Sequence, residues 1–376
     1  MRILQVLPAL NSGGVERCVI EITDYIAKKY PNDEIFIMSS GGWMQSLMHK
    51  KCQHIKHNLS SKNPYNIIKN SKIIAEFCNQ KKIDIVHVHS RAPAWSCYLA
   101  KNKAKFKLVT TVHAAYGVKG LFKKMYNRIM LKGDAVIAVS DFLKNHIMQT
   151  YRTIGKKNIF VIKRGVQISN FSREKVTSQR ISLMADKIRL PDGKFTICVP
   201  ARISSGKGHK ELIKVLTIMK NVDFVCYFVG DFDKKIKFKK DLDKLILASK
   251  MEEKIHFTGK VEDMPAIYAI SDLVILPSIK PESFGKVIIE AGSMGCIVLT
   301  TAIGNPVDIM KSNPYGFLVQ PNDEIAMSRK IFEIMNLKIH HDAEKKIAIA
   351  KFYQDNYDVE KTCHAEYEIY KSLLKK

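Results

Sequence analysis

Two glutamates, Glu282 and Glu290, stand eight positions apart on either side of a short segment of small, aromatic and basic residues. The apolar run 273–276 predicts a buried strand before them, and a helix is expected to begin near Lys286. The first N–H groups of a helix are unpaired and lie at the positive end of its dipole, so this order predicts an anion site. Gly285 lets the backbone approach a ligand, and Lys286 adds a cation.

The two carboxylates indicate what kind of ligand carries the anion. Eight helical residues span about 12 Å, so the pair can hold two ends of one extended molecule. A carboxylate that accepts hydrogen bonds from two hydroxyls is a common way to bind a diol. We therefore expect a nucleotide sugar, with one of the two glutamates on hydroxyls of the sugar and the other on hydroxyls of the ribose. An ordinary amphipathic helix with a Glu near its N-terminus is the alternative, and the two glutamates alone do not exclude it.

A second basic loop follows the apolar run 195–200 and carries Arg202 and Lys207, with Gly206 and Gly208 beside the lysine. Two fixed cations there can neutralise a diphosphate and stabilise it as a leaving group. The loop is not a Walker A motif, because Gly208 stands where that motif needs Ser or Thr. A surface Arg and Lys in a loop are the plainer alternative.

The motifs resemble those of the retaining glycosyltransferases of family 4 (glycosyl transferase group 1), including enzymes of lipopolysaccharide and cell-envelope synthesis. The hallmark of that family is Glu, seven residues, Glu, and the likeness runs from Gly13 to Gly304 with the motifs in family order. It implies an α/β GT-B fold, in which two Rossmann-like, doubly wound parallel-sheet domains face a central cleft. It also implies a hexosyltransferase-type enzyme that moves a sugar from a nucleotide-diphosphate donor to an acceptor.

The resemblance assigns roles to single residues. His113 and Glu282 are the expected catalytic residues near the donor sugar. The expected donor-binding residues are Gly13, Gly14, Arg202, Lys207, Gly259, Lys260, Val261, Glu282, Ser283, Phe284, Gly285, Lys286 and Glu290. The implied mechanism is a front-face displacement that requires no metal and no cofactor besides the nucleotide sugar. At 304–308 the chain departs from the family pattern, and Pro306 removes a backbone donor, which leaves the donor sugar open.

Strand patterns at 34–38, 83–89, 107–112 and 135–139 alternate with helical stretches, which predicts a parallel doubly wound sheet. We expect an acceptor-binding domain over 1–168 and a donor-binding domain over 169–376. The C-terminal helix, about 354–376, is expected to cross back onto the first domain, as such tails do in the GT-B fold.

Three histidines lie near the carboxyl ends of predicted strands, where ligands of such sheets bind. His87 and His89 alternate along one strand, so we expect them to point to opposite faces of the sheet, an arrangement poorly suited to joint metal binding. His113 ends its strand and precedes a small-residue loop. A lone histidine is more often structural than catalytic.

The net charge of +25 is concentrated in residues 1–170, where 28 Lys and Arg face 9 Asp and Glu. Such a field favours anionic partners. The segment Lys119–Lys132 can form a helix with Phe122, Met125, Ile129 and Met130 on one face and basic residues around the other. We therefore expect a lipid-linked or glycan acceptor and docking on an anionic membrane surface. A core-packed helix with a solvated lysine face is the alternative.

No apolar run approaches the roughly 18 residues that cross a bilayer, and no signal peptide is visible. The expected location is cytoplasmic, with peripheral attachment to the inner face of the membrane. The eight scattered cysteines fit a reduced core. Nucleic acid is not an expected partner, because no contiguous set of aromatic and basic residues is present.

Two rival functions stay open. Asp231 and Asp233 form an Asp-x-Asp after a predicted strand, the metal and nucleotide-sugar motif of the GT-A transferases. That arrangement would make the enzyme metal-dependent. The other rival is a nucleotide-sugar epimerase of GT-B type, which would release free sugar without an acceptor.

Overall fold

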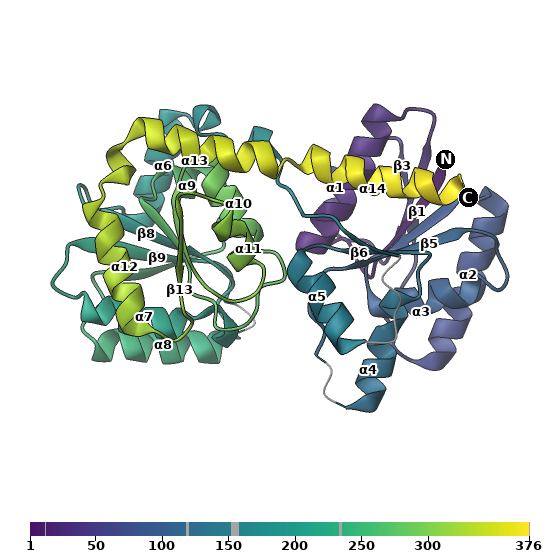
Figure 1. Ribbon diagram of the computed structural model, residues 1–376, viewed down its shortest axis with the longest axis horizontal. Coiled ribbons are helices and arrows are strands. Elements are labelled where there is room, and N and C mark those ends of the chain that lie inside the picture. Colours follow the sequence, from purple (N-terminus) through teal and green to yellow (C-terminus); the bar gives the residue numbers. More distant parts are fainter. Residues whose placement is uncertain (12, 118–119, 152–157, 233–234, 376) are drawn as a thin grey trace. The chain divides into compact units, whose positions relative to one another are not determined.

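The computed structural model describes residues 1–11, 13–117, 120–151, 158–232 and 235–375, and the chain forms two compact units (Figure 1). Unit 1 comprises Met1–Arg164 and Val359–Lys376, and unit 2 comprises Gly165–Asp358. Each unit is a parallel sheet with helices on both faces, as Figure 1 shows.

The sheet of unit 1 has the strand order β3-β2-β1-β4-β5-β6-β7 among the described residues, and every pairing is parallel. The strands are β1 (Arg2–Val6), β2 (Glu34–Ser39), β3 (Cys52–Lys56), β4 (Ile85–Val88), β5 (Lys107–Val112), β6 (Ala135–Ala138) and β7 (Ile159–Val161). The chain winds in opposite directions on either side of β1 and β4, and such a switch point is where open α/β sheets bind ligands. Gln5 and His87 are register partners in this central pair.

The helices of unit 1 are α1 (Gly14–Lys29), α2 (Pro64–Lys81), α3 (Arg91–Ala100), α4 (Leu121–Asn127), α5 (Asp141–Thr150) and α14 (Val359–Leu374). The C-terminal helix α14 packs beside α1 in this unit. Its apolar face places Cys363, Tyr367 and Tyr370 in the same buried cluster as Ile3 of β1. The last helix is therefore part of the core behind the first strand.

The sheet of unit 2 has the order β10-β9-β8-β11-β12-β13 and is also parallel. The strands are β8 (Phe195–Pro200), β9 (Phe224–Val229), β10 (Ile255–Gly259), β11 (Leu273–Leu276), β12 (Ile297–Thr301) and β13 (Gly316–Val319). The helices are α6 (Ser178–Ile188), α7 (His209–Ile218), α8 (Ile236–Ala248), α9 (Met264–Ala269), α10 (Lys286–Ser293), α11 (Pro306–Lys311), α12 (Glu324–Asn336) and α13 (Ala343–Asn356). The switch point of this sheet lies between β8 and β11, the two strands that lead into the basic loop and into the Glu282 loop.

The strand predictions are confirmed within one or two residues at each end. Strand β3 is absent from the sequence analysis because it lies at the sheet edge and only Cys52 in it is buried, so no apolar run marks it. Ser140 caps α5, since its hydroxyl accepts a hydrogen bond from the Leu143 N–H at 3.2 Å. All eight cysteines are buried free thiols, as expected.

Candidate functional site

The loop between β11 and α10 carries the first candidate residues. Gly285 caps α10 with φ 92°, a left-handed conformation that favours glycine, and it turns the chain into the helix immediately before Lys286. The helix N-terminus and the Lys286 ammonium thus belong to the same turn, which is the arrangement that binds anions. Phe284 is buried and anchors the turn, and its carbonyl accepts a hydrogen bond of 2.8 Å from the Asn305 side chain.

Lys207 reaches this loop because Gly208 lets two segments meet. A side chain at Gly208 would overlap the carbonyl of Pro277, which follows β11, and Gly208 also has φ 75°. The close approach sets the start of α7 against the end of β11. It is reinforced by a hydrogen bond of 3.1 Å from the Ile279 N–H to the Gly206 carbonyl.

The Glu282 carboxylate is held at its place by two side chains. One carboxylate oxygen pairs with the Lys207 ammonium and accepts a hydrogen bond of 2.6 Å from the Ser278 hydroxyl. Its backbone is fixed as well, because Glu282 forms a parallel bridge with Gly304 and its carbonyl accepts from the Asn305 N–H at 2.9 Å. The 304–308 segment, which departs from the family pattern, therefore supports the Glu282 backbone in this chain.

Glu290 lies on the second turn of α10 and is partly buried. The hydroxyl of Tyr268, on α9, donates a hydrogen bond of 3.1 Å to its Oε2. Tyr268 is fully buried, and burial together with the adjacent Glu290 raises the pKa of its phenol well above its usual range. The phenol therefore stays a donor at any ordinary pH, which holds the carboxylate in one orientation.

The other expected donor residues of unit 2 lie at or after the ends of three strands, β8, β10 and β11. Arg202 is exposed in the loop after β8, and the N–H of Ile203 beside it donates to the Asp231 carbonyl at 3.1 Å. Gly259 ends β10 with φ 70°, Lys260 is exposed, and Val261 is buried, so Val261 can offer a ligand only its backbone. Ser283 is partly buried beside Glu282.

In unit 1, Gly13 and Gly14 are exposed at the start of α1. A side chain at Gly13 would collide with the Glu16 carboxylate, whereas Gly14 has open space around it. The start of α1 therefore has open space at Gly14, while the Glu16 carboxylate lies against Gly13. The backbone at Gly14 can approach an anionic ligand.

His113 follows β5 and belongs to a hydrogen-bonded group of buried polar residues. Its Nε2 lies 3.1 Å from Nδ1 of His89, and Nε2 of His89 lies 2.8 Å from Oε1 of Gln5. Nδ1 of His87 lies 2.6 Å from the Tyr370 hydroxyl, which accepts from the Gln5 side chain at 3.1 Å. The predicted active-site histidine is therefore the outermost member of a chain that crosses the middle of the sheet.

The expectation that His87 and His89 point to opposite faces is wrong. Their ring centroids lie 4.2 Å apart, and both side chains are buried. Strand β4 ends at Val88, so His89 lies beyond the alternation of the strand and its ring turns back toward His87.

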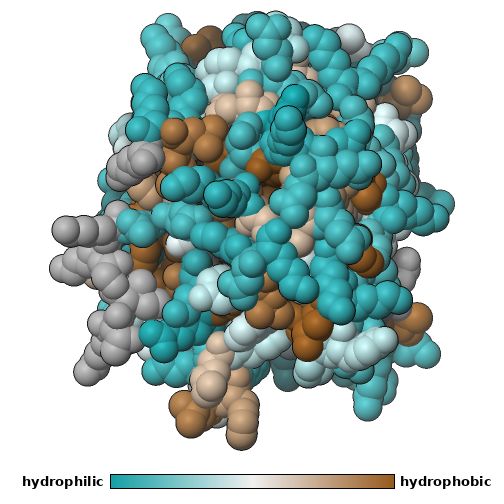
Figure 2. Space-filling view, turned by 90° about the vertical axis from the view of Figure 1, so that its right-hand side faces the viewer, coloured by the Kyte–Doolittle hydropathy of each residue, from teal (hydrophilic) through white to brown (hydrophobic). Residues whose placement is uncertain are grey.

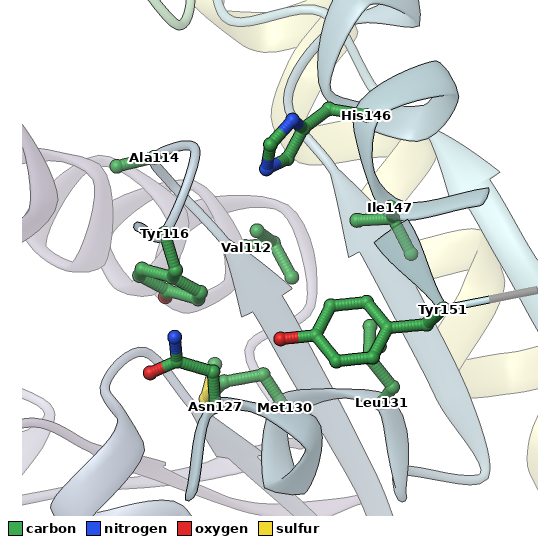
Figure 3. A pocket seen from close by; sticks show the side chains of 9 residues that line it. All are labelled: Val112, Ala114, Tyr116, Asn127, Met130, Leu131, His146, Ile147 and Tyr151. Carbon is green, nitrogen blue, oxygen red and sulfur yellow. The ribbon is translucent and has the colours of Figure 1, made fainter. Parts of the chain in front are cut away.

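A small hollow lies beside the loop that follows His113 (Figure 3), with Val112, Tyr116, Asn127 and Tyr151 pointing into it. It encloses about 10 Å³, about the space of one water, so it is too small for a sugar. The guanidinium of Arg91 stacks 4.5 Å from the Tyr116 ring and donates to Asn127 at 2.7 Å, which fastens the loop to α3.

Comparisons with known proteins show the family of the chain. Residues 12–170 match the family described as Glycosyltransferase Family 4, and residues 182–351 match the family described as Glycosyl transferases group 1. A solved glycosyltransferase from Rickettsia africae is 39% identical, with a TM-score of 0.91 over 100% of this chain and 99% of that one. The chain belongs to the family 4 (group 1) glycosyltransferases.

This glycosyltransferase is also similar to a more distant sequence relative and to a solved structure of the same fold. It is 26% identical to the N-acetyl-alpha-D-glucosaminyl L-malate synthase of Bacillus anthracis over 72% of this chain and 70% of that protein. Anabaena HepE, solved in complex with UDP-glucose, shares the fold at 19% identity, with a TM-score of 0.81 over 99% of this chain and 100% of that one. The two parallel sheets and these neighbours establish the GT-B fold expected from the sequence.

The segment of this glycosyltransferase expected to dock on membranes has both exposed and buried apolar residues. Lys119 lies outside the described residues. Phe122 on α4 is 90% exposed and Met125 is 59% exposed, whereas Ile129 and Met130, in the 3₁₀ turn that follows, are 2% and 0% exposed. The apolar residues expected on one face thus divide into a core-packed pair and an exposed group. The side of unit 1 in Figure 2 is mainly hydrophilic, with apolar side chains in small groups.

Over the described residues, no group of three or more His, Cys, Asp and Glu is arranged to hold a metal ion, and Asp233 of the rival motif lies outside them. Asp231 follows β9. The same part of the glycosyltransferase contains no helix long and apolar enough to cross a membrane.

Ser278, Tyr268, Gln5 and Tyr370 are absent from the sequence analysis, although each holds an expected site residue or its neighbour. Only Gln5 carries a sequence signal, since it is a polar residue inside an apolar strand and must find partners when buried. The others act through contacts that the fold alone creates.

Proposed function

We propose that this glycosyltransferase moves a sugar, with retention of anomeric configuration, from a nucleotide-diphosphate sugar to an acceptor. The observation that carries the proposal is the cluster of Lys207, Glu282 and Ser278 beside the N-terminus of α10. It combines a fixed cation and a fixed carboxylate at one sheet switch point, which are the groups that a phosphate and a sugar diol require.

The residues of unit 2 have distinct roles in this proposal. Arg202, Lys207 and the amides at the start of α10 neutralise the diphosphate, which stabilises it as the sugar bond breaks. Glu282 binds hydroxyls of the sugar, and Glu290 binds the ribose. Gly259, Lys260 and Val261 read the base through their backbone. The departing phosphate takes the proton of the acceptor hydroxyl on the same face of the sugar, so configuration is retained.

Two parts of unit 1 complete the proposed mechanism. His113 binds a hydroxyl of the donor sugar, and Gly13 and Gly14 approach the diphosphate with their backbone. The cations and helix N-termini occupy the role that a metal has in GT-A enzymes, so we propose that no metal takes part.

The proposed acceptor is a lipid-linked or lipopolysaccharide-type glycan at the inner face of the cytoplasmic membrane. Two observations support it. Residues 1–170 carry a net charge of +19, from 28 basic and 9 acidic residues, and such a field attracts anionic surfaces. Within the same unit, Leu121, Phe122 and Met125 are exposed on α4 beside Lys123 and Lys124. Apolar and basic groups together are what peripheral membrane binding needs.

A thermal-shift screen with UDP-glucose, GDP-mannose and ADP-glucose tests the donor half of the proposal. A donor at 100 times its Kd stabilises the protein by about 2.7 kcal/mol, which raises the Tm of a unit of this size by about 5–10 °C. The donor that shifts the Tm is then incubated without an acceptor. Rapid stoichiometric release of free sugar favours the epimerase, and the absence of any shift with a broad donor set contradicts the proposal.

A further inference from the structure

The polar chain that ends at His113 runs through four elements of unit 1. It links Tyr370 on α14, Gln5 on β1, His89 after β4 and His113 after β5. A side branch links the Tyr370 hydroxyl to Nδ1 of His87, whose Nε2 lies 2.7 Å from the Thr111 hydroxyl. Gln5, His87, His89 and Tyr370 are all buried, so they depend on each other rather than on solvent for hydrogen bonds.

All three imidazoles are neutral at pH 7. Burial lowers the pKa of His89 to about 3, helped by the nearby Arg164 guanidinium, and burial lowers the pKa of His87 and His113 well below the usual range. A neutral imidazole has one N–H and one acceptor nitrogen. Each ring in the chain must therefore donate from one nitrogen and accept at the other.

This requirement leaves two consistent arrangements of the protons. If donor and acceptor are exchanged in one hydrogen bond of the chain, they must be exchanged in all the others. In the first, the Gln5 amide nitrogen donates to Tyr370 and its oxygen accepts from Nε2–H of His89. Nδ1 of His89 is then an acceptor, so His113 must donate from Nε2. In the second arrangement the Gln5 amide is turned over, and His113 carries its proton on Nδ1.

The Gln5 amide has its nitrogen 3.1 Å from the Tyr370 hydroxyl and its oxygen 2.8 Å from His89, which is the first arrangement. The Tyr370 O–H is then directed to Nδ1 of His87 at 2.6 Å, and His87 donates from Nε2 to Thr111. Every link has a donor and an acceptor. His113 is left with Nδ1 as its acceptor nitrogen.

Tyr370 can hold this arrangement because α14 is fixed close by. Arg164 and Glu366, one turn before Tyr370, form a buried ion pair, and the Thr362 hydroxyl donates to the Lys163 carbonyl at 2.9 Å. Removal of one partner of a buried pair is strongly unfavourable, so the register of the helix is well determined.

We propose that Gln5 and Tyr370 are positioning residues that hold His113 as its Nε2–H tautomer, so that Nδ1 accepts a hydrogen bond from a hydroxyl of the donor sugar. The last clause rests on the proposed function, whereas the tautomer does not. Tyr370 on the C-terminal helix thereby anchors the Gln5 amide in the orientation that, through His89, leaves Nδ1 of His113 as the acceptor nitrogen. In the other tautomer, His113 would present Nδ1–H, a donor, to that hydroxyl instead of an acceptor nitrogen.

The test uses the full chain without ligand, labelled with ¹⁵N-histidine, because long-range ¹H–¹⁵N correlations distinguish the two tautomers. The His113 signals are identified by their loss in His113→Gln. We expect Nε2–H tautomers for His113 and His89 in the wild type. In Tyr370→Phe the Gln5 amide loses its anchor, so His113 should populate both tautomers. Gln5→Met should do the same, and the double variant should change nothing further.

Tyr367→Phe is the matched control. Tyr367 is a buried tyrosine on the same helix, but its hydroxyl donates to Asp33 at 2.8 Å and lies outside the chain of histidines. The Tyr367→Phe variant should lose stability to an extent similar to that of Tyr370→Phe, while His113 keeps its wild-type tautomer. An Nδ1–H tautomer of His113 in the wild type, or a wild-type spectrum in Tyr370→Phe, would overturn the proposal.

A kinetic comparison tests the consequence for the reaction. With the donor selected by the thermal-shift screen, Tyr370→Phe should lower kcat/KM by about threefold to tenfold, the effect of one neutral hydrogen bond. Tyr367→Phe should leave kcat/KM unchanged. If no donor is turned over, the proposed function fails while the tautomer result stands. If both tyrosine variants lower kcat/KM equally, the positioning role is excluded.

Discussion

Tyr268 donates a hydrogen bond of 3.1 Å to Glu290, from a fully buried ring on α9 to a carboxylate on α10. The bond joins the proposed ribose-binding residue to the core of unit 2. A carboxylate held in this way meets a diol without first losing side-chain freedom, which lowers the entropic cost of binding.

Tyr268→Phe should therefore weaken donor binding without slowing the chemical step. The loss of one hydrogen bond predicts a rise of about threefold to tenfold in the KM for the donor, with kcat nearly unchanged, because the ribose is remote from the reacting carbon. Tyr227→Phe is the control, since the Tyr227 hydroxyl donates to the Arg189 carbonyl at 3.3 Å. Equal KM values for the two variants would argue against a role of Tyr268 in donor binding.

The buried histidine chain predicts a specific dependence of stability on pH. His89 has a folded pKa of about 3 and an unfolded pKa of about 6.5, so between these values it binds a proton only when the chain unfolds. The free energy of unfolding should fall as the pH drops below 6.5 and should stop falling from this cause near pH 3. Denaturant unfolding between pH 7 and pH 5 measures the slope. In His89→Gln it should be smaller by about 1 kcal/mol per pH unit, and an identical slope would be inconsistent with a neutral buried His89.

Membrane docking predicts salt-sensitive binding of the wild type to anionic vesicles and none to neutral ones. Each lysine near such a surface contributes about 1 kcal/mol, so Lys123→Gln, Lys124→Gln and Lys132→Gln together should abolish flotation. The control has the same charge change elsewhere in unit 1, at Lys82, Lys103 and Lys105. Equal loss of flotation in both triple variants would assign the binding to net charge alone and not to α4.

A metal-free mechanism predicts that EDTA leaves the rate of transfer unchanged. The Lys207 ammonium and the N-terminus of α10 are fixed parts of the chain, so removal of divalent ions does not affect them. Asp231→Asn should also keep most of the activity. Loss of activity in EDTA that manganese restores would favour the Asp231 motif instead.

The fold was predictable because parallel strands buried on both faces are nearly continuous apolar runs, as in 195–200 and 273–276. The edge strand β3 lacks that signal, because only Cys52 in it is buried. His89 shows a second limit of prediction from sequence. Side chains alternate between the two faces of a sheet only within a strand, and β4 ends at Val88, one residue before His89.

The candidate site was only partly visible from the sequence. Lys207 and Glu282 are found by the chemistry of their loops, and their ion pair joins residues 75 positions apart. Tyr370 and Gln5 are 365 positions apart, and no local pattern connects them. Residues that form hydrogen bonds to a site residue from the core are brought there by the packing of helices onto the sheet. The spacing of residues along the chain does not predict that packing.

The most direct test of the account is the release of nucleoside diphosphate from the selected donor by Glu282→Gln, Lys207→Ala and Lys210→Ala. Lys210 is an exposed lysine at the start of α7 and serves as the control, and circular dichroism and Tm establish that each variant is folded. We predict that kcat/KM falls by at least about 100-fold in Glu282→Gln and in Lys207→Ala, because each removes a charged group fixed at the reacting centre, and that Lys210→Ala stays within about twofold of the wild type. Near-normal turnover by folded Glu282→Gln or Lys207→Ala would contradict the account.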